Sequence, residues 1–430
     1  MAIYDSGDRI EKWRYAVKEF KVLVNGESIE IPKERISYIS IVDDYLSNLY
    51  PIFQLQFVLS SDTYYEIQKY KNSLKIYLRI DKFYYYEDKT KRADLSQSSC
   101  YKPWINDTFD IILDANTENM NAALEREEMQ SDYTIIKKDN SDELDKVVNG
   151  VTVYLYKVTN ELKTNVNKIF TGVNVTDVIA WLLTQAKIKN VIMQQPDNTK
   201  RYDTFVVPPL SISKALYWID TYYGIYKLGT IFFVDFDYFY IIPFDGSNRK
   251  AFIRNDTTTT NFVFPSSESK SHSNEPGVLK KVNKDTSNYI VGIGDTLNIS
   301  NSSISNDLIA GSDSTSIDSF SGSSTTAESG ATTKTNKKTQ AITTNITENE
   351  FYDTMKAAIA KSLSTEISFT VTNYDIDMIK PNKTFSVLFE DSAYTKKYTG
   401  KYTIVKATHA FSREGEALML QSTIILRKMK

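Results

Sequence analysis

The first 171 residues contain several short segments in which hydrophobic and polar positions alternate. In FQLQFVL (53–59), Phe53, Leu55 and Phe57 fall on one face of an extended chain, and the two glutamines fall on the other. This period of two residues is typical of a strand with one solvated face. Comparable segments are WRYAVKEFKVLV (13–24), ISYISIV (36–42), LKIYLRI (74–80), FDIILDA (109–115) and VTVYLYKV (151–158). Strands separated by turn signals such as Asn25-Gly26 predict a sandwich or a barrel.

Residues 116–150 interrupt this pattern. TENMNAALEREEMQSDY is charged and helical in character, and the KKDNSDELDKVVNG that follows is polar and loop-like. We therefore expect residues 1–171 to form an N-terminal β-barrel domain with a helical and loop excursion at 116–150 on its surface.

The hydrophobic period changes to that of a helix after Gly172. In NVTDVIAWLLTQAKI (174–188) the apolar residues share one helical face, and Thr176 is the candidate N-cap. Pro208-Pro209 breaks the chain, Ser211 or Ser213 caps a second helix, and Gly224 ends it. The segments NVIMQ (190–194), IFFV (231–234) and YFYII (238–242) read as strands, the last two forming a hairpin. Residues 172–250 are thus predicted to be a small α/β module.

The remaining residues, 251–430, return to strand character. The strand candidates are EISFTVT (366–372), TFSVLFE (384–390), GKYTIVKATHAFS (400–412) and LMLQSTIILRK (418–428), and a helix is expected over 351–363 after the capping-box pattern of 347–350. Residues at about 300–346 are rich in Ser, Thr and Gly, and they have too few large apolar residues to offset chain entropy. The prediction is a β-rich α+β fold: two β-barrel-like domains flank the module, and a flexible low-complexity loop interrupts the second.

Composition narrows the function classes. The chain has 430 residues, and 51 Lys and Arg against 54 Asp and Glu give a net charge of −3, with no basic stripe for sequence-specific nucleic-acid binding. Its single cysteine, Cys100, excludes an intramolecular disulfide framework. The first residues lack the apolar core of a secretory signal, and the longest apolar run is too short for a spanning helix, so we expect no stable membrane insertion.

Few residues offer catalytic chemistry. The two histidines are His272 and His409, and we expect a structural role for His409 rather than that of a general base. Two histidines are also too few for a zinc site with three protein nitrogens. Two carboxylate pairs, Asp235 with Asp237 and Asp375 with Asp377, are more typical of turns than of a hydrolase, although oxygen-only metal binding stays open at both. We predict no catalytic residue, no metal and no cofactor.

Three stretches, in this order along the chain, resemble the baseplate hub proteins of tailed phages, a family that includes the late-control protein and the hub-like part of type VI secretion spike proteins. They are NVTDVIAWLLTQAKI (174–188), PPLSISKALYWIDTYYGIYKLGTIFFVDFDYFYI (208–241) and the closing strands from Asn382 to Leu426, with their G-x-Y-x-I and H-x-F-S patterns. All three lie in the part of the chain from residue 172 onward. The first 171 residues match the family only as a β-rich pattern.

The resemblance implies a non-enzymatic structural protein of the virion, a hub assembled in the cytoplasm of the host bacterium. Such hubs are homotrimers in which two tube-like barrels per chain form a pseudo-sixfold ring with a central channel. One face meets the hexameric tail tube protein, the other holds the spike or tail-lysin protein, and other baseplate proteins surround it. The resemblance also implies that DNA passes through the channel without being read.

Two other functions stay open. Unrecognised carboxylates would make the chain a tail-associated cell-wall hydrolase, and exposed rings at 217–240 would suit a carbohydrate- or receptor-binding tail module. Core packing of those rings is favoured over a binding platform. Tyr222, Tyr226 and Tyr238 are not all needed inside so small a core, and they are the candidates for contacts with a neighbouring subunit.

Overall fold

The computed structural model describes most of the chain outside several connecting segments. The described residues are 8–70, 73–86, 102–113, 148–156, 160–227, 229–236, 238–244, 259–264, 276–281, 287–291, 297–303, 317–326, 335–342, 365–389, 398–414 and 417–429. Most of the 116–150 excursion, the helix expected over 351–363, Cys100, Asp237 and His272 lie outside these ranges.

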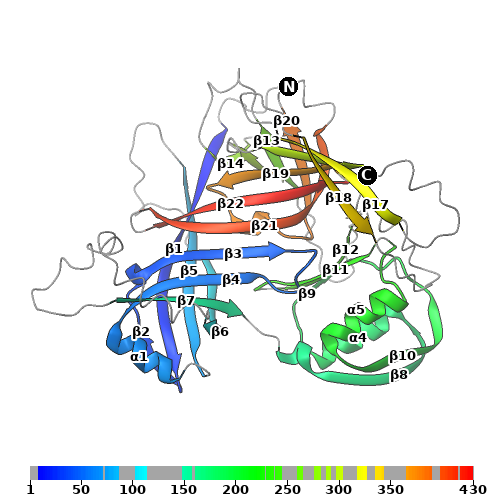
Figure 1. Cartoon of the computed structure of the whole chain (residues 1–430), viewed down its shortest axis with the longest axis horizontal. Coiled ribbons are helices and arrows are strands. Elements are labelled where there is room, and N and C mark those ends of the chain that lie inside the picture. The colour runs from blue at the N-terminus through cyan, green and yellow to red at the C-terminus, as the bar shows by residue number, and fades with distance from the viewer. Residues whose placement is uncertain are drawn as a thin grey trace, which may run out of the picture.

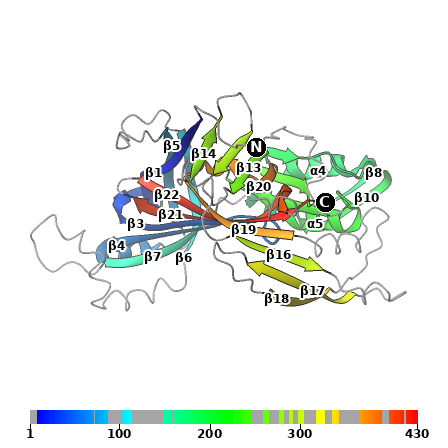
Figure 2. The same cartoon turned by 90° about the horizontal axis from the view of Figure 1, so that it is seen from above.

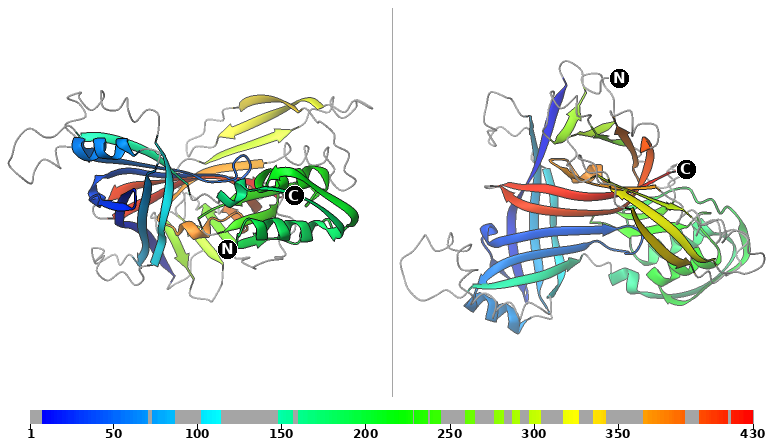
Figure 3. Two further views of the ribbon diagram at one scale, coloured as in Figure 1. Left: turned by 90° about the horizontal axis from the view of Figure 1, so that it is seen from below. Right: turned by 45° about the horizontal axis from the view of Figure 1, so that its top comes forward.

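Eleven strands close into a ring. In the order of their pairing they are β1 (Arg9–Val24), β5 (Lys75–Tyr86), β6 (Lys102–Leu113), β7 (Val148–Tyr156), β4 (Ile52–Ser60), β3 (Ile36–Asp44), β21 (Gly400–Glu414), β20 (Thr384–Phe389), β13 (Thr259–Phe264), β15 (Asn288–Val291) and β14 (Gly277–Lys280), which pairs with β1. Strands β3, β4, β21 and β22 run across the upright strands β1, β5 and β6 (Figures 1 and 3). The prediction of a β-rich fold is confirmed.

Strand β22 (Ala417–Lys428) joins the two sides of this ring. It pairs along its length with β21, it pairs with β19 (Thr365–Thr372), and it meets β1 where Tyr15 lies opposite Leu418. Strands from both predicted β domains are therefore hydrogen-bonded to one another, and a single hydrophobic core runs through both. The domain boundaries at 171 and 250 stay a prediction about folding units.

The alternating segments form strands because one face of each reaches this core. Phe53, Leu55 and Phe57 of β4 are buried, whereas the glutamines between them are partly exposed. At the end of β1, Asn25 and Gly26 have φ values of 49° and 89°. Two consecutive positive φ values make the type I′ turn that fits the twist of a hairpin, and they place Val24 opposite Glu27 of β2 (Glu27–Glu30).

The middle module has the predicted helices α4 (Val175–Gln185) and α5 (Ile212–Tyr222) and the strands β9 (Val191–Met193), β11 (Thr230–Val234) and β12 (Phe239–Pro243). The N-cap of α4 is Asn174 and not Thr176. The side chain of Asn174 accepts from the Asp177 N–H at 2.9 Å, and the Asp177 carboxylate accepts from the Asn174 N–H at 3.1 Å. These two hydrogen bonds satisfy the backbone N–H groups of Asn174 and Asp177, which a cap at Thr176 would leave without an acceptor.

The second helix begins and ends as the sequence predicts. Ser211 is its N-cap, and Gly224 follows its C-terminus with φ of 72° and donates to the Ile219 carbonyl at 3.0 Å. The break predicted at Pro208-Pro209 is wrong, because both prolines lie inside β10 (Arg201–Ser211). That strand pairs with β8 (Asn165–Asn174), and its register shifts between Val207 and Leu210, where the missing proline N–H groups are tolerated.

Some elements were not predicted. One is helix α1 (Ser61–Lys69), which follows β4. Within the predicted low-complexity loop, β16 (Asn298–Ser303), β17 (Ile317–Thr326) and β18 (Thr335–Ile342) form an antiparallel extension of β19 (Figure 2), so a loop without strands is wrong at these residues. Ser and Thr alternation carries no hydrophobic period, yet an extended Ser/Thr chain can still fill a ladder of backbone hydrogen bonds.

The module's small sheet is covered on both faces. Ile231, Phe233 and Tyr240 belong to the core of the ring, whereas Phe232 and Phe239, which point the other way, belong to a second core beneath α4 and α5. Short 3-10 turns complete the described elements at Lys33–Arg35, Asn160–Lys163 and Ile376–Met378. The last of these turns, η7, lies where the ring and the module meet.

Candidate functional site

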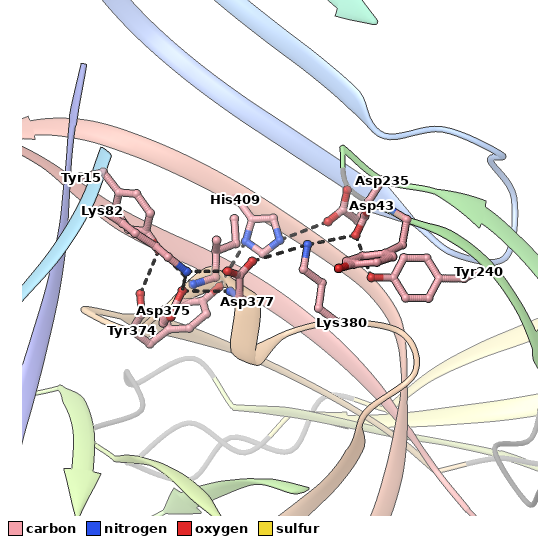
Figure 4. A network of polar contacts seen from close by, with 12 residues as sticks. Tyr15, Asp43, Lys82, Asp235, Tyr240, Tyr374, Asp375, Asp377, Lys380 and His409 are labelled. Carbon is pink, nitrogen blue, oxygen red and sulfur yellow. Dashed lines mark hydrogen bonds and ion pairs between the residues drawn. The ribbon is translucent and has the colours of Figure 1, made fainter. Parts of the chain in front are cut away.

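A network of polar side chains lies at the junction of the ring strands, η7 and the β11–β12 hairpin. Figure 4 shows its members converging from β1, β3, β5, β12, β21 and the segment around η7. Most of these side chains are buried, so their hydrogen bonds and ion pairs are not in competition with bulk water.

Lys82 of β5 joins the two carboxylates at η7. Its Nζ lies 2.7 Å from Asp375 Oδ1 and 2.5 Å from Asp377 Oδ2, and Asp375 also caps η7 by accepting from the Asp377 N–H at 3.1 Å. Burial alone would lower the pKa of Lys82, but the two carboxylates outweigh it and raise that pKa. Burial would likewise raise the pKa of Asp377, and the charges of Lys380, Lys82 and Lys383 lower it instead.

Lys380 connects this cluster to the module. Its Nζ lies 3.7 Å from Asp377 Oδ1 and 3.0 Å from Asp235 Oδ2. Asp235 also accepts from the Tyr240 hydroxyl at 2.9 Å and from the Tyr238 N–H at 2.6 Å. Asp235 thus has the hairpin-turn role that the sequence favours, and it belongs to the same network as the pair Asp375 and Asp377.

A second part of the network surrounds His409 on β21. Its Nδ1 lies 2.7 Å from Ser422 Oγ, and its Nε2 lies 3.4 Å from Asp43 Oδ2. The Tyr374 hydroxyl donates to Ser422 Oγ at 2.6 Å. Asp43, His409 and Ser422 are the residue types of a hydrolase triad, and the sequence alone did not bring them together.

This triad-like arrangement is closed to a substrate. His409 and Ser422 are both 0% exposed, on neighbouring strands in the interior. A nucleophilic serine must reach a scissile carbonyl beside hydrogen-bond donors for the oxyanion, and no substrate reaches Ser422 in this conformation. The arrangement therefore links β3, β21 and β22, as the structural role expected for His409 requires.

Two tyrosines extend the same linkage to β1. The Tyr15 hydroxyl donates to the Tyr374 carbonyl at 3.2 Å and accepts from the Ile376 N–H at 2.9 Å. Burial raises the pKa of both Tyr15 and Tyr374 well above the ordinary value, which keeps both hydroxyls protonated. They act as neutral hydrogen-bond partners and not as bases.

The three tyrosines proposed for inter-subunit contact differ in burial. Tyr222 on α5 is 50% exposed, whereas Tyr238 is only partly exposed and packs against the ring core. Tyr226 is 1% exposed, and its hydroxyl donates to the carbonyls of Gln194 at 2.6 Å and Ile241 at 3.0 Å. Its burial leaves Tyr226 no surface for another chain, and contact by Tyr222 and Tyr238 stays a prediction.

Within the ranges that the structure describes, no three His, Cys, Asp or Glu side chains are grouped so as to hold a metal ion. None of the helices in those ranges combines the length and the apolar character that crossing a membrane requires.

The chain has distant similarity to solved structures of tail and secretion proteins. The tail protein from Neisseria meningitidis MC58 is 11% identical, with 96% of this chain and 97% of that chain covered and a TM-score of 0.41. The 43 kDa tail protein of prophage MuSo2 from Shewanella oneidensis is 10% identical, with 96% and 100% covered and a TM-score of 0.43. TM-scores below 0.5 are too low to establish a shared function.

A third similar structure is the E. coli c3393 protein, described as a type VI secretion component with structural similarity to the T4 tail proteins gp27 and gp5. It is 9% identical, with 94% of this chain and 76% of that chain covered and a TM-score of 0.38. No curated protein matches the chain.

A family model described as the bacteriophage PBS1 gene 109 protein matches residues 7–429, which is nearly the whole sequence. A phage family is what the resemblance of the helix, hairpin and closing strands predicted, and the match confirms the prediction at that level. The chain belongs to the bacteriophage PBS1 gene 109 protein family.

Proposed function

We propose that the protein is a structural, non-enzymatic component of the phage tail, a baseplate or tail hub that connects the tail tube to the central spike or tail-lysin protein. Membership of a phage family supports a virion role. The ordered resemblance of residues 174–188, 208–241 and 382–426 to hub proteins supports the hub role within the virion.

The observation that carries the non-enzymatic part of the proposal is the closure of the polar network. The residues best suited to chemistry, His409 and Ser422, are fully buried between strands, and Lys82 is 7% exposed between two carboxylates. Hydrogen bonds and ion pairs between buried polar groups hold the elements that carry them in a fixed arrangement. A rigid junction between the ring and the module suits a protein that must keep its shape inside a large assembly.

The finer features of the proposal follow from the resemblance. The chain forms a homotrimer with a central channel, it meets the tail tube protein on one face and the spike or tail lysin on the other, and it contacts other baseplate proteins. DNA passes through the channel without sequence recognition. The protein is assembled in the host cytoplasm and resides in the virion tail.

Light scattering combined with negative-stain imaging of the purified chain tests this assembly, with and without the tail tube protein. The expected result is a trimeric ring with a central channel that binds the tube protein. A stable monomer that never associates with the tube protein contradicts the proposal.

One observation favours a second candidate, a cell-wall hydrolase: His409 Nδ1 is hydrogen-bonded to Ser422 Oγ at 2.7 Å, and Asp43 Oδ2 lies 3.4 Å from His409 Nε2. A turbidity assay on cell walls separates the two. We expect no lysis by the wild type. Lysis that is lost in Ser422→Ala, or in Asp375→Asn or Asp377→Asn, would replace the structural proposal with an enzymatic one.

A further inference from the structure

Charged side chains of alternating sign form a continuous line from the ring to the module. The line runs from Lys82 on β5 through Asp377 and Lys380 to Asp235 at the hairpin tip (Figure 4). The successive nitrogen–oxygen distances are 2.5, 3.7 and 3.0 Å. Lys82 and Asp377 are 295 residues apart in sequence, and Lys380 and Asp235 are 145 apart, so the line joins three distant segments.

The two inner members each face two partners. Asp377 uses Oδ2 toward Lys82 and Oδ1 toward Lys380. Oδ1 is buried although the side chain as a whole is 42% exposed, and at 3.7 Å its contact with Lys380 is an ion pair without a hydrogen bond. Lys380 faces Asp377 on one side and Asp235 on the other. A substitution of Lys82 therefore changes the electrostatic environment and the position of Asp377 next to Lys380. Because Lys380 also pairs with Asp235, the change reaches Asp235.

The far end of the line holds the part of the module that contacts the ring. Asp235 accepts from the Tyr238 N–H and so closes the β11–β12 turn. Next to it, the Phe236 ring packs edge-on against Phe53 of β4 at 5.6 Å and Phe109 of β6 at 5.8 Å. The position of Asp235 thus affects the packing of the adjacent Phe236 ring against strands β4 and β6.

Three of the four charges are largely removed from water, since Lys82 and Asp235 are each 7% exposed and Lys380 is 17% exposed. Removing one partner of such a pair leaves the other charge uncompensated. The neighbouring charged side chains then feel a large change in electrostatic energy, because salt screens buried charges only weakly.

We propose that Lys82, Asp377, Lys380 and Asp235 form a charge relay that couples strand β5 to the hairpin tip of the module. The position of the module against the ring strands then depends on Lys82, although Lys82 and Asp235 lie at opposite ends of the line (Figure 4). This coupling is a property of the fold, and it does not depend on whether the protein is a tail hub.

Hydrogen exchange on the full-length chain tests the relay. Lys82→Met should raise the exchange rate of the Tyr238 amide and of the β12 amides by about tenfold or more, because the tip loses its fixed position. Lys21→Met is the matched control: Lys21 also faces two carboxylates, Glu19 at 3.3 Å and Glu30 at 3.4 Å, but it lies on the far part of β1. The control should leave hairpin exchange unchanged. Faster exchange confined to β5 and η7 in Lys82→Met overturns the relay.

A double-mutant cycle gives the second test. Lys82→Met and Asp235→Asn, combined, should deviate from additivity by about tenfold in the unfolding equilibrium constant, within the range seen for residues in one network. If Lys82→Met does not fold, Asp377→Asn takes its place in the cycle with Asp235→Asn, since Asp377 is the most exposed of the four. Additive effects within about a factor of two, in the cycle that folds, contradict the coupling.

Discussion

His409 and Ser422 lie directly opposite each other on the paired strands β21 and β22, with 2.7 Å between Nδ1 and Oγ. Ser422 also accepts from the Tyr374 hydroxyl, so one small side chain serves two buried partners. We expect Ser422→Ala to destabilise the protein by about 1–3 kcal/mol, because both partners then lose a hydrogen bond in a dry environment. Urea unfolding measures the loss. Ser412→Ala, at an exposed serine of the neighbouring strand β21, should stay within about 0.5 kcal/mol of wild type.

The lowered pKa of Asp377 should make the stability of the protein depend on pH. Lys380, Lys82 and Lys383 hold its pKa below the ordinary 3.8 in the folded chain. A carboxyl group whose folded pKa is lowered contributes stability that is fully present above the unfolded pKa and is lost as the pH falls through the folded pKa. The free energy of unfolding of the wild type should therefore fall more steeply below pH 3.8 than that of Asp377→Asn. Denaturant titrations at a series of acidic pH values measure both slopes, and parallel curves would refute the expectation.

The capping box of α4 predicts which residue starts the helix. Asn174→Ala removes the acceptor for the Asp177 N–H and should cost about 1 kcal/mol. Thr176→Ala, at the position that helix periodicity alone suggested, lies inside the helix and should change stability by less than about 0.5 kcal/mol. Thermal unfolding followed by circular dichroism compares the two variants. A larger loss for Thr176→Ala would return the cap to Thr176.

Sequence periodicity located many of the elements whose one face meets a core, although it missed helix α1, which buries Tyr64 and Ile67, and it missed strands that depend on pairing alone. Strand β4 and helix α4 carry clear periods of two and of 3.6 residues, and both were found. Strands β17 and β18 pair through their backbones in a Ser- and Thr-rich sequence that has no such period. Strand β10 was hidden by Pro208-Pro209, which the register shift accommodates.

The polar network was only partly visible in the sequence. Asp235, Asp375 and His409 stood out as residue types near turns and strands, but their partners did not. Lys82 is one of many scattered lysines, and it reaches Asp375 from 293 residues away because β5 and η7 pack together in the fold. Contacts of that kind follow from the topology of the ring, and no local pattern of residues encodes them.

Burial separates two of the tyrosines proposed for subunit contact, and it predicts opposite phenotypes for them. Tyr222 is half exposed, so Tyr222→Ala should leave the stability of the single chain within about 0.5 kcal/mol of wild type while it weakens association between chains. Tyr226→Phe should instead cost about 1–2 kcal/mol, since the buried Gln194 carbonyl loses its donor, and should leave association unchanged. Chemical denaturation and sedimentation of the same samples give both quantities. Unchanged association in Tyr222→Ala would remove Tyr222 from the subunit interface and leave Tyr238 as the remaining candidate.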